Sequence, residues 1–502
     1  MINAWVKAYL RSRLPRMMQS MNHPEETQRK VLYHLLRQAA FTSFGKANGF
    51  ARMNTYAHFA ETVPVSAYES FRPWIDRCLN GEEQVIWPSP IRWFAKSSGT
   101  TDDRSKYVPV SNESLKECHY RAGRDILSFY TKNHPDHRLF TGKSLVLTGS
   151  TQPTGFGKLR TGDISGVLIE NLAPWIHFFR TPAKPLALIP DWDQKIDRFL
   201  AVVPKENVTF ISGVPSWMQV LITKMMQQEN VEDLHRIWPS LELFIHGAVN
   251  FEPYRTQFAS FFPKNNIRYY ETYNASEGFF ALQDRPEPGE MLLMTDYGIF
   301  YEFIELDGNG LSNRIIPIWE TEVGKNYALL ISTNAGLWRY LIGDTITFTS
   351  TQPYRIRITG RTKHFINAFG EELMVDNAEQ ALAYAMAQTG AAVRDYTVAP
   401  VYLKTDGAGS HEWVIEFSKS PHSMEQFVQA LDHKLREINS DYDAKRKGNL
   451  TMDLPVIRAV PEDTFYRWLK SRGRLGGQHK VPRLFNDRRY VDEILELVKL
   501  HE

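Results

Sequence analysis

Hydrophobic positions near the N-terminus recur with the period of an α-helix. Between residues 27 and 40, apolar residues such as Leu35 and Ala39 fall on one helical face. The stretch SAYE, residues 66–69, carries the serine and the glutamate of a capping box, which predicts the start of another helix. The first hundred residues are therefore predicted to be mainly helical.

Beyond residue 140 the pattern changes to short apolar runs that end in glycine and lead into helical patterns. Three of them are SLVLTG (144–149), NVTFISG (207–213) and LELFIHG (241–247). After the second run, Pro215 stands where a first-turn proline belongs. Alternation of strands and helices predicts an α/β core.

Between Met291 and Ile358 the apolar runs are closely spaced strands, which indicate a barrel or a mixed sheet rather than strand–helix–strand units. After Gly360 the order becomes helix, strand, strand, helix, strand, helix. We therefore expect an α/β protein. Its large N-terminal domain, residues 1–360, would combine mixed or parallel sheets flanked by helices with a β-barrel-like part. A small α+β domain, residues 361–502, would follow.

Composition narrows the class of partner. The chain has 502 residues, 43% of them hydrophobic, and its 59 Lys and Arg nearly balance 57 Asp and Glu, for a net charge of +2. No global basic field therefore favours nucleic acid or an anionic membrane. No apolar run approaches the roughly 18 to 20 residues that span a bilayer. The N-terminal stretch is basic and amphipathic, which would suit docking on a membrane surface or on a partner. We expect a terminal helix packed on the fold instead.

Only two cysteines occur, Cys78 and Cys118, which is typical of a protein in a reducing compartment. We expect a cytoplasmic protein that binds neither nucleic acid nor membrane. The sequence carries no signal for its oligomeric state.

The stretch KSSGTTDDRSK, residues 96–106, has the chemistry of a phosphate-binding loop. Ser97, Ser98, Thr100 and Thr101 surround Gly99, which lets the backbone approach a ligand closely. Hydroxyl groups and backbone N–H groups donate to phosphate oxygens, and nearby lysines and arginines supply positive charge. The stretch lacks the Gly-Lys-Ser/Thr ending of a P-loop. Taken alone, such a stretch is more often a hydroxyl-rich turn than a binding loop.

Three further stretches are candidates for a site. YETYNASEGFFA (270–281) places a carboxylate beside hydroxyl groups at the end of a strand, a set that suits Mg²⁺. GLWRYLIGDTITF (336–348) holds Asp344, which could accept both hydroxyls of a ribose. SRGRLGGQHKVPR (471–483) holds Lys480 in a glycine-rich loop. Each alone is also consistent with a solvated turn or a basic loop.

The order of these four stretches along the chain resembles the auxin-responsive acyl acid-amido synthetases, a branch of the adenylate-forming enzymes. FTSFGKANGF (41–50), VPVSAYESFRPWIDRCLNGEE (63–83) and KYVPVS (106–111) are similar to that family as well. The resemblance spans nearly the whole chain. It implies that the small C-terminal domain is mobile and rotates between two steps of the reaction.

The resemblance also implies roles for individual residues. ATP and Mg²⁺ would be the cofactors, and Glu277 would bind the metal. Lys363 and Lys480 would meet the reacting phosphate or carboxylate. The remaining residues would bind the nucleotide: Ser97, Ser98, Thr100 and Thr101 at the β- and γ-phosphates, Tyr273 and Asn274 at adenine, Ser276 near the α-phosphate and Asp344 at the ribose.

The function implied is ATP-dependent adenylation of a carboxylic acid, with release of pyrophosphate, followed by acyl transfer to the amine of an amino acid. One alternative keeps the adenylation but transfers the acyl group to a thiol, of coenzyme A or a carrier protein. Another is a nucleotide-binding homologue without catalysis. The sequence identifies neither the acyl acid nor the acceptor.

Overall fold

The computed structural model describes most of the chain: residues 2–97, 106–153, 159–248, 251–264, 266–307, 310–362, 365–366, 368, 371, 373–401, 409–439, 442–443, 446, 452–473, 481–485 and 487–499. The chain divides into two compact units. One comprises residues 1–248 and 264–357, and the other comprises residues 249–263 and 358–502. The functional division proposed from the sequence, with an ATP-binding part and a mobile small domain, stays a prediction.

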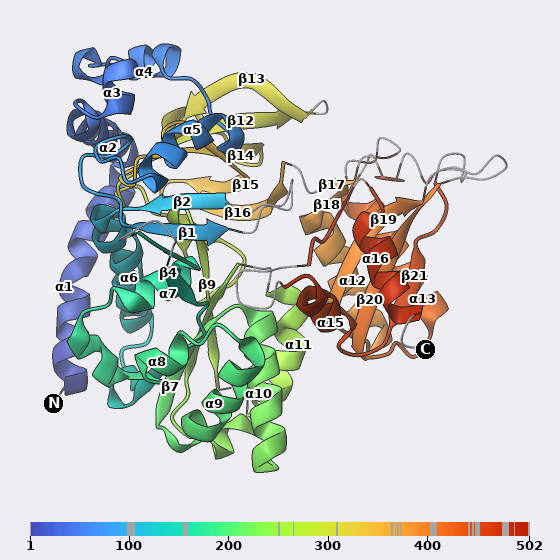
Figure 1. Ribbon diagram of the computed structural model, residues 1–502. Coiled ribbons are helices and arrows are strands. Elements are labelled where there is room, and N and C mark those ends of the chain that lie inside the picture. Colours follow the sequence, from blue (N-terminus) through green and yellow to red (C-terminus); the bar gives the residue numbers. More distant parts are fainter. Residues whose placement is uncertain are drawn as a thin grey trace. The chain divides into compact units, whose positions relative to one another are not determined.

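A twelve-stranded mixed sheet runs through the first unit (Figure 1), in the order β13-β12-β14-β15-β16-β11-β10-β9-β8-β7-β3-β6. Its strands β6, β3, β7, β8 and β9 are parallel to one another. The strand bounds are β3 (Lys143–Val146), β6 (Arg180–Thr181), β7 (Val208–Gly213), β8 (Leu243–Gly247), β9 (Arg268–Ala275), β10 (Gly278–Leu282), β11 (Met291–Leu293), β12 (Ile299–Asp307), β13 (Gly310–Pro317), β14 (Asn326–Thr333), β15 (Tyr340–Thr351) and β16 (Tyr354–Arg361).

A second, four-stranded sheet has the order β2-β1-β5-β4. It is formed by β1 (Trp93–Ser97), β2 (Lys106–Val110), β4 (Thr151–Pro153) and β5 (Arg160–Gly162). The helices of this unit are α1 (Ile2–Asn22), α2 (Pro24–Ala39), α3 (Ser43–Ala47), α4 (Tyr56–Thr62), α5 (Tyr68–Leu79), α6 (Tyr120–Asn133), α7 (Ile164–Glu170), α8 (Lys184–Ala187), α9 (Trp192–Val202) and α10 (Pro215–Glu229). The expected α/β architecture, with a large sheet and flanking helices, is confirmed.

The closely spaced strands that follow Met291 continue this same large sheet. Strands β11 to β16 join it in antiparallel pairs such as β12 with β14 and β14 with β15. Of the two alternatives drawn from the sequence, a barrel or a mixed sheet, the mixed sheet is therefore the one found. The reason is that β11 pairs with β10 on one side and with β16 on the other, which ties these strands to the parallel part.

Local predictions hold where the hydrophobic period is strong. Helix α2 buries Leu32, Leu35 and Leu36 against β12 and β14, and α10 begins at Pro215. The capping box at residues 66–69 is wrong. Helix α5 begins at Tyr68 without a side-chain cap, because the backbone of Ser66 instead pairs with the chain around Tyr340.

The second unit is an α+β fold around a three-stranded sheet with the order β19-β20-β21. Helices α12 and α13 pack against each other, and a core that includes Leu382, Trp413 and Leu431 is buried there. Helix α11 (Glu252–Ser260) contacts α12 and β19, although the chain enters it directly from β8. The other bounds are β17 (Phe365–Ile366), β18 (Leu373–Met374), α12 (Val375–Thr389), β19 (Ala392–Val401), β20 (Ser410–Lys419), α13 (Met424–Ile438), β21 (Val456–Val460), α15 (Thr464–Ser471) and α16 (Arg489–Lys499).

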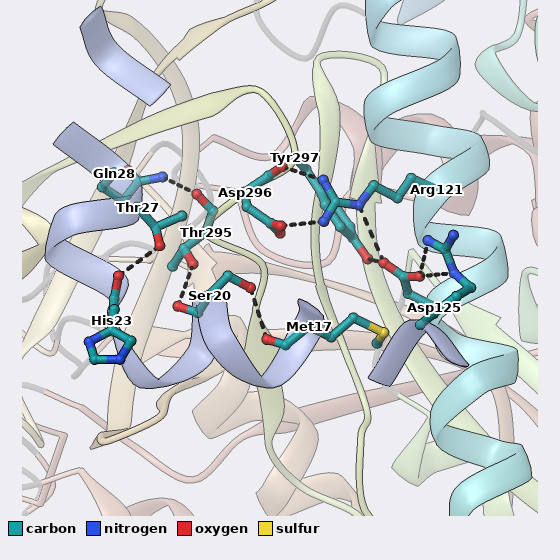
Figure 2. Close-up of polar contacts among 11 residues, drawn as sticks. Met17, Ser20, His23, Thr27, Gln28, Arg121, Asp125, Thr295, Asp296 and Tyr297 are labelled. Carbon is teal, nitrogen blue, oxygen red and sulfur yellow. Dashed lines mark hydrogen bonds and ion pairs between the residues drawn. The ribbon is translucent and has the colours of Figure 1, made fainter. Parts of the chain in front are cut away.

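The N-terminal helix α1 is a packed helix, as expected. It lies along α6 and buries Leu10 and Met17. A polar network shown in Figure 2 joins α1 to the core, centred on the buried carboxylate of Asp125. This carboxylate accepts from Nε of Arg13 and from the hydroxyl of Tyr297, both at 2.9 Å. None of the described helices is both long enough and apolar enough to cross a membrane.

Removing the hydroxyl of Tyr297 tests how much this network stabilises the fold. Hydrogen bonds to a charged group contribute about 1.5–3 kcal/mol, and here both partners are buried, so Tyr297→Phe is expected to lower the free energy of unfolding by about 2 kcal/mol. Urea unfolding measures this change. Tyr33→Phe, at a half-buried position on α2, is the matched control. Equal unfolding midpoints for wild type and Tyr297→Phe would show that the hydrogen bond between Tyr297 and Asp125 does not stabilise the fold.

Candidate functional site

The parallel strands of the large sheet all end on the same side, and one of the polar stretches predicted from the sequence, residues 270–281, lies at the end of one of them, β9. Gly247 at the end of β8 is paired with Thr272 of β9. A Cβ at Gly247 would lie 2.4 Å from the carbonyl oxygen of Thr272, so only glycine fits there. In open α/β sheets, ligands bind at the carboxyl ends of the strands. This edge of the sheet, at the carboxyl ends of its parallel strands, is therefore where a nucleotide is expected.

Tyr273 and Asp344 meet at this edge, although 71 residues separate them along the chain. The hydroxyl of Tyr273 donates to Oδ2 of Asp344 at 2.7 Å. Tyr273 is 4% exposed and Asp344 is 7% exposed. The hydrogen bond therefore fixes the orientation of a buried carboxylate. Phe280 packs its ring 4.8 Å from the Tyr273 ring, which holds the tyrosine in place.

A β-bulge in β15 directs Asp344 toward β9. On the partner strand β14, Ala328 pairs with Thr345 and Leu330 pairs with Leu341, so three residues of β15 stand opposite one of β14. Gly343 within this bulge has a φ of 93°, a conformation that favours glycine. Bulges commonly redirect a side chain beside a functional site.

Ser276 and Glu277 form the two-residue turn of the hairpin between β9 and β10. Gly278 pairs with Ala275 directly across this turn. Ser276 is buried and Glu277 is half-buried, so one hydroxyl and one carboxylate lie together just after the end of β9. Asn274, two residues before the turn, is half-buried and accepts at 3.4 Å from the hydroxyl of Thr272. Of the site residues predicted from the sequence that the structure describes fully, Tyr273 and Asp344 are in direct contact, and Asn274, Ser276 and Glu277 follow within four residues of Tyr273 along β9 and its turn.

The other predicted site residues lie wholly or partly outside the described part of the chain. Ser98, Thr100 and Thr101 fall within residues 98–105, and Lys363 and Lys480 are likewise outside it. Ser97 is described as the last residue of β1, where it pairs with Lys106 of β2. The two strands that flank the hydroxyl-rich stretch therefore lie side by side. The roles of these residues remain predictions.

The described residues supply few side chains to coordinate a metal ion. Among them, no three His, Cys, Asp or Glu side chains gather into a metal site. Mg²⁺ binds to proteins through one or two carboxylates and takes its other ligands from water and phosphate. A single carboxylate at Glu277 fits that pattern.

The sequence did not predict a buried lysine that lies beside the end of β3. Lys195 of α9 is 2% exposed, and its Nζ donates to the carbonyl oxygen of Thr148 at 2.7 Å. Near it, Oδ2 of Asp163 accepts from the backbone N–H of Ser150 at 2.9 Å. Burial lowers the pKa of Lys195 to about 8, while the charge of Asp163 opposes this shift. Nothing in the helix WDQKIDRFLAV distinguishes this lysine from a solvated one.

The lowered pKa of Lys195 predicts a specific dependence of stability on pH. Below pH 8 both the folded and the unfolded chain carry the proton, so the full cost of burying the ammonium group is present. Between pH 8 and 10.5 the unfolded chain keeps the proton that the folded chain has released, which raises the free energy of unfolding. Wild type should therefore gain stability relative to Lys195→Met over this range.

Urea unfolding of both proteins at pH 8 and at pH 10 measures the difference, in which other titrating groups cancel. Lys205→Met, at an exposed position, is the matched control and should show no such trend. A stability difference that stays constant between the two pH values would contradict the burial of a charged amine.

Comparisons with known proteins cover nearly the whole chain. Residues 13–267 match the GH3 family N-terminal domain, residues 292–361 the GH3 family central domain, and residues 376–489 the GH3 family C-terminal domain. The chain is 23% identical to indole-3-acetic acid-amido synthetase GH3.3 of Arabidopsis thaliana, over 91% of this chain and 88% of the relative.

Two solved structures share the fold. The AtGH3.15 acyl acid amido synthetase, in complex with 2,4-DB, superposes with a TM-score of 0.80 and 17% identity over 98% of this chain and 97% of that one. A 2-hydroxyisobutyryl-CoA ligase in the postadenylation state, in complex with 2-HIB-AMP, has a TM-score of 0.58 and 12% identity over 96% and 92% of the two chains.

Proposed function

Since this chain belongs to the GH3 family, we propose that it is an ATP-dependent ligase that joins a carboxylic acid to the amine of an amino acid. Its relatives are named as amido synthetases and ligases, including enzymes named for indole-3-acetic acid and for 4-substituted benzoates. The observation that carries the proposal is the buried pair of Tyr273 and Asp344 beside the turn of Ser276 and Glu277, at the sheet edge where nucleotides bind.

The reaction needs two displacements and no covalent nucleophile from the protein. In the first, a carboxylate oxygen of the acid attacks the α-phosphorus of ATP, the bond to the β-phosphate breaks, and pyrophosphate leaves. In the second, the amine attacks the acyl carbon, AMP leaves with the carboxylate oxygen, and the amine gives up a proton. Positioning and charge stabilisation therefore account for catalysis.

Each described site residue contributes to positioning. Asp344, oriented by Tyr273, would accept the two hydroxyls of the ribose. Tyr273 and Asn274 would border the adenine, and Ser276 would donate to the α-phosphate. Glu277 would hold Mg²⁺, which neutralises phosphate charge when bound. The hydroxyls of Ser97, Ser98, Thr100 and Thr101 would bind the β- and γ-phosphates.

Two lysines would supply positive charge to the reacting groups. We place Lys363 and Lys480 in this role on the resemblance of their motifs to the family. Both belong to the second unit, which includes residues 358–502. Movement of that unit would bring the lysines to the phosphate for adenylation and carry them away before acyl transfer. The closed arrangement would also exclude water during adenylation.

Acid-dependent release of pyrophosphate is the direct test. The protein would be incubated with Mg²⁺, ATP, hydroxylamine as a trap and a panel of aryl, indolyl and fatty acids. We expect release that depends on one class of acid. Glu277→Ala should reduce it about 100-fold, with partial recovery at high Mg²⁺ concentration, because one metal ligand is lost. Glu320→Ala, an exposed glutamate on the same unit, is the matched control.

The acceptor is then identified from the product. Amino acids and thiols, including coenzyme A, would be supplied together, and an amide product supports the proposal. A thioester product would instead make the chain a thiol-directed ligase. If ATP raises the melting temperature but no acid gives pyrophosphate, the chain binds nucleotide without this chemistry.

A further inference from the structure

Among the described residues, four arginines are buried, and three of them have an acidic partner. Arg339 grips Glu302 with two nitrogens at 2.9 Å. Arg446 grips Asp432, and Arg355 grips Asp284, in each case through both carboxylate oxygens. The fourth, Arg180, is 3% exposed, and no described residue is a hydrogen-bond partner of its Nε, Nη1 or Nη2.

An arginine buried without a partner is costly for a folded protein. Burial of an unpaired charge is strongly unfavourable, and buried polar groups nearly always find a partner. Burial lowers the pKa of Arg180 to about 10, and no acidic side chain acts on this pKa to oppose the shift. A partner from outside the chain would satisfy the guanidinium as the internal carboxylates satisfy the other three.

The surroundings of Arg180 indicate what that partner is. His177, three residues earlier, has a buried Nδ1 without a partner, and the charge of Arg180 acts on its ring. The acid that acts on His177 is Glu170, which is already paired with Lys184 at 2.9 Å and lies 3.8 Å from Arg160. A surplus of positive charge therefore remains here, and a negatively charged ligand would reduce it.

Aromatic side chains stand beside this surplus charge. The 3₁₀ helix Pro174–Phe179 leads directly into β6, and it exposes three aromatic residues: Trp175 at 63%, Phe178 at 78% and Phe179 at 43%. Exposed aromatic groups next to a charged group suit a ligand with an apolar body and one polar end. The hydroxyl of Ser144 on β3 donates to the carbonyl of Phe179 at 3.2 Å and holds this helix against the sheet.

The surroundings of Arg180 are distinct from the ends of β8 and β9, where the nucleotide is expected. Strand β6 is the outermost strand of the large sheet, four strands from β9, which is a lateral separation of roughly 19 Å at a strand spacing of about 4.8 Å. Arg180 is also in register with Ser144, Phe210 and Leu243, near the start of β8 rather than its end. A ligand here would not be in contact with Asp344 or Glu277.

We propose that Arg180 and His177 form a second binding site, at the β6 edge, for the carboxylate of a small organic acid with an apolar body. The guanidinium binds the carboxylate through two parallel N–H···O bonds, and His177 donates a third. The 3₁₀ helix moves aside to admit the ligand and its aromatic rings then cover the apolar body. A free acid and an amide conjugate of an amino acid both have this chemistry, since the conjugate keeps the α-carboxylate.

Thermal shift in a buffer free of carboxylate and phosphate tests the site. The probes are benzoate, N-benzoylglycine, acetate and inorganic phosphate. Wild type should show a saturable rise of about 3 °C at 100 times the dissociation constant with benzoate or N-benzoylglycine. Which of these two binds more tightly distinguishes a free acid from a conjugate. Arg285→Met, an exposed arginine on the same unit, should keep the shift.

Arg180→Met should abolish the benzoate shift and, without any anion, should melt no lower than wild type, because it removes an unpaired buried charge. Arg180→Lys keeps the positive charge but loses the two parallel N–H donors of the guanidinium, and it should weaken benzoate binding at least about tenfold. The ATP-induced shift should be unchanged in both variants. The proposal is overturned if the methionine variant keeps the benzoate shift or melts well below wild type, or if the part of the shift that depends on Arg180 is produced by phosphate and not by benzoate.

Discussion

Replacing Asp344 with alanine is expected to lower kcat/KM for ATP about 100-fold. In the proposed site this carboxylate would accept two hydrogen bonds from ribose hydroxyls, each contributing about 1.5–3 kcal/mol, so their loss would correspond to at least about 3 kcal/mol. The carboxylate is buried and its orientation is fixed by the hydrogen bond from Tyr273, and alanine has no side-chain acceptor to take its place. Steady-state pyrophosphate release at varied ATP concentration measures the effect.

Tyr273→Phe separates the orientation of the carboxylate from its presence. This variant keeps the negative charge of Asp344 and loses the 2.7 Å hydrogen bond that orients it, so we expect a smaller loss in kcat/KM, about tenfold. Urea unfolding of both variants shows whether the kinetic loss exceeds any loss of folded protein. A fully folded Asp344→Ala enzyme with wild-type kcat/KM for ATP would remove Asp344 from the nucleotide site.

Lys480→Ala is expected to reduce the rate of adenylation about 300-fold while leaving the dissociation constant of ATP within about threefold. The reason is that a cation aimed at charge developing in the transition state contributes to the chemical step more than to ground-state binding. Single-turnover formation of pyrophosphate measures the rate, and the ATP-dependent rise in melting temperature measures binding.

The chain directly after Lys480 is well anchored, which makes this test local. The carbonyl of Arg483 accepts from the N–H of Val398 on β19 at 2.8 Å, and Val398 in turn accepts from Phe485 at 3.1 Å. The guanidinium of Arg483 also pairs with Asp395 of the same strand. Lys419→Ala, at an exposed position at the end of β20, is the matched control. Near-normal adenylation by Lys480→Ala would remove this lysine from the mechanism.

Local sequence patterns predicted much of the architecture. The periods of apolar residues placed α2, β3, β7 and β8, and Pro215 marked the first turn of α10, because these features depend on neighbours in the chain. The order of four motifs was enough to indicate the family, and matches along nearly the whole chain show it. The failed capping box at Ser66 shows the limit of such patterns. There the strand around Tyr340, more than 270 residues away, takes the backbone groups that a local cap would have used.

By itself, the sequence determined which residue types are available for nucleotide chemistry and in what order they occur. Only the tertiary structure decided that Tyr273 orients Asp344, that Lys195 is buried and that Arg180 finds no hydrogen-bond partner in the part of the chain that the structure describes. Each of these facts depends on which distant segments pack around a side chain, and helical or strand periodicity specifies a face without specifying its neighbour. Burial then sets the cost of a charge, so the pKa of Lys195 and the unpaired state of Arg180 follow from packing rather than from residue type.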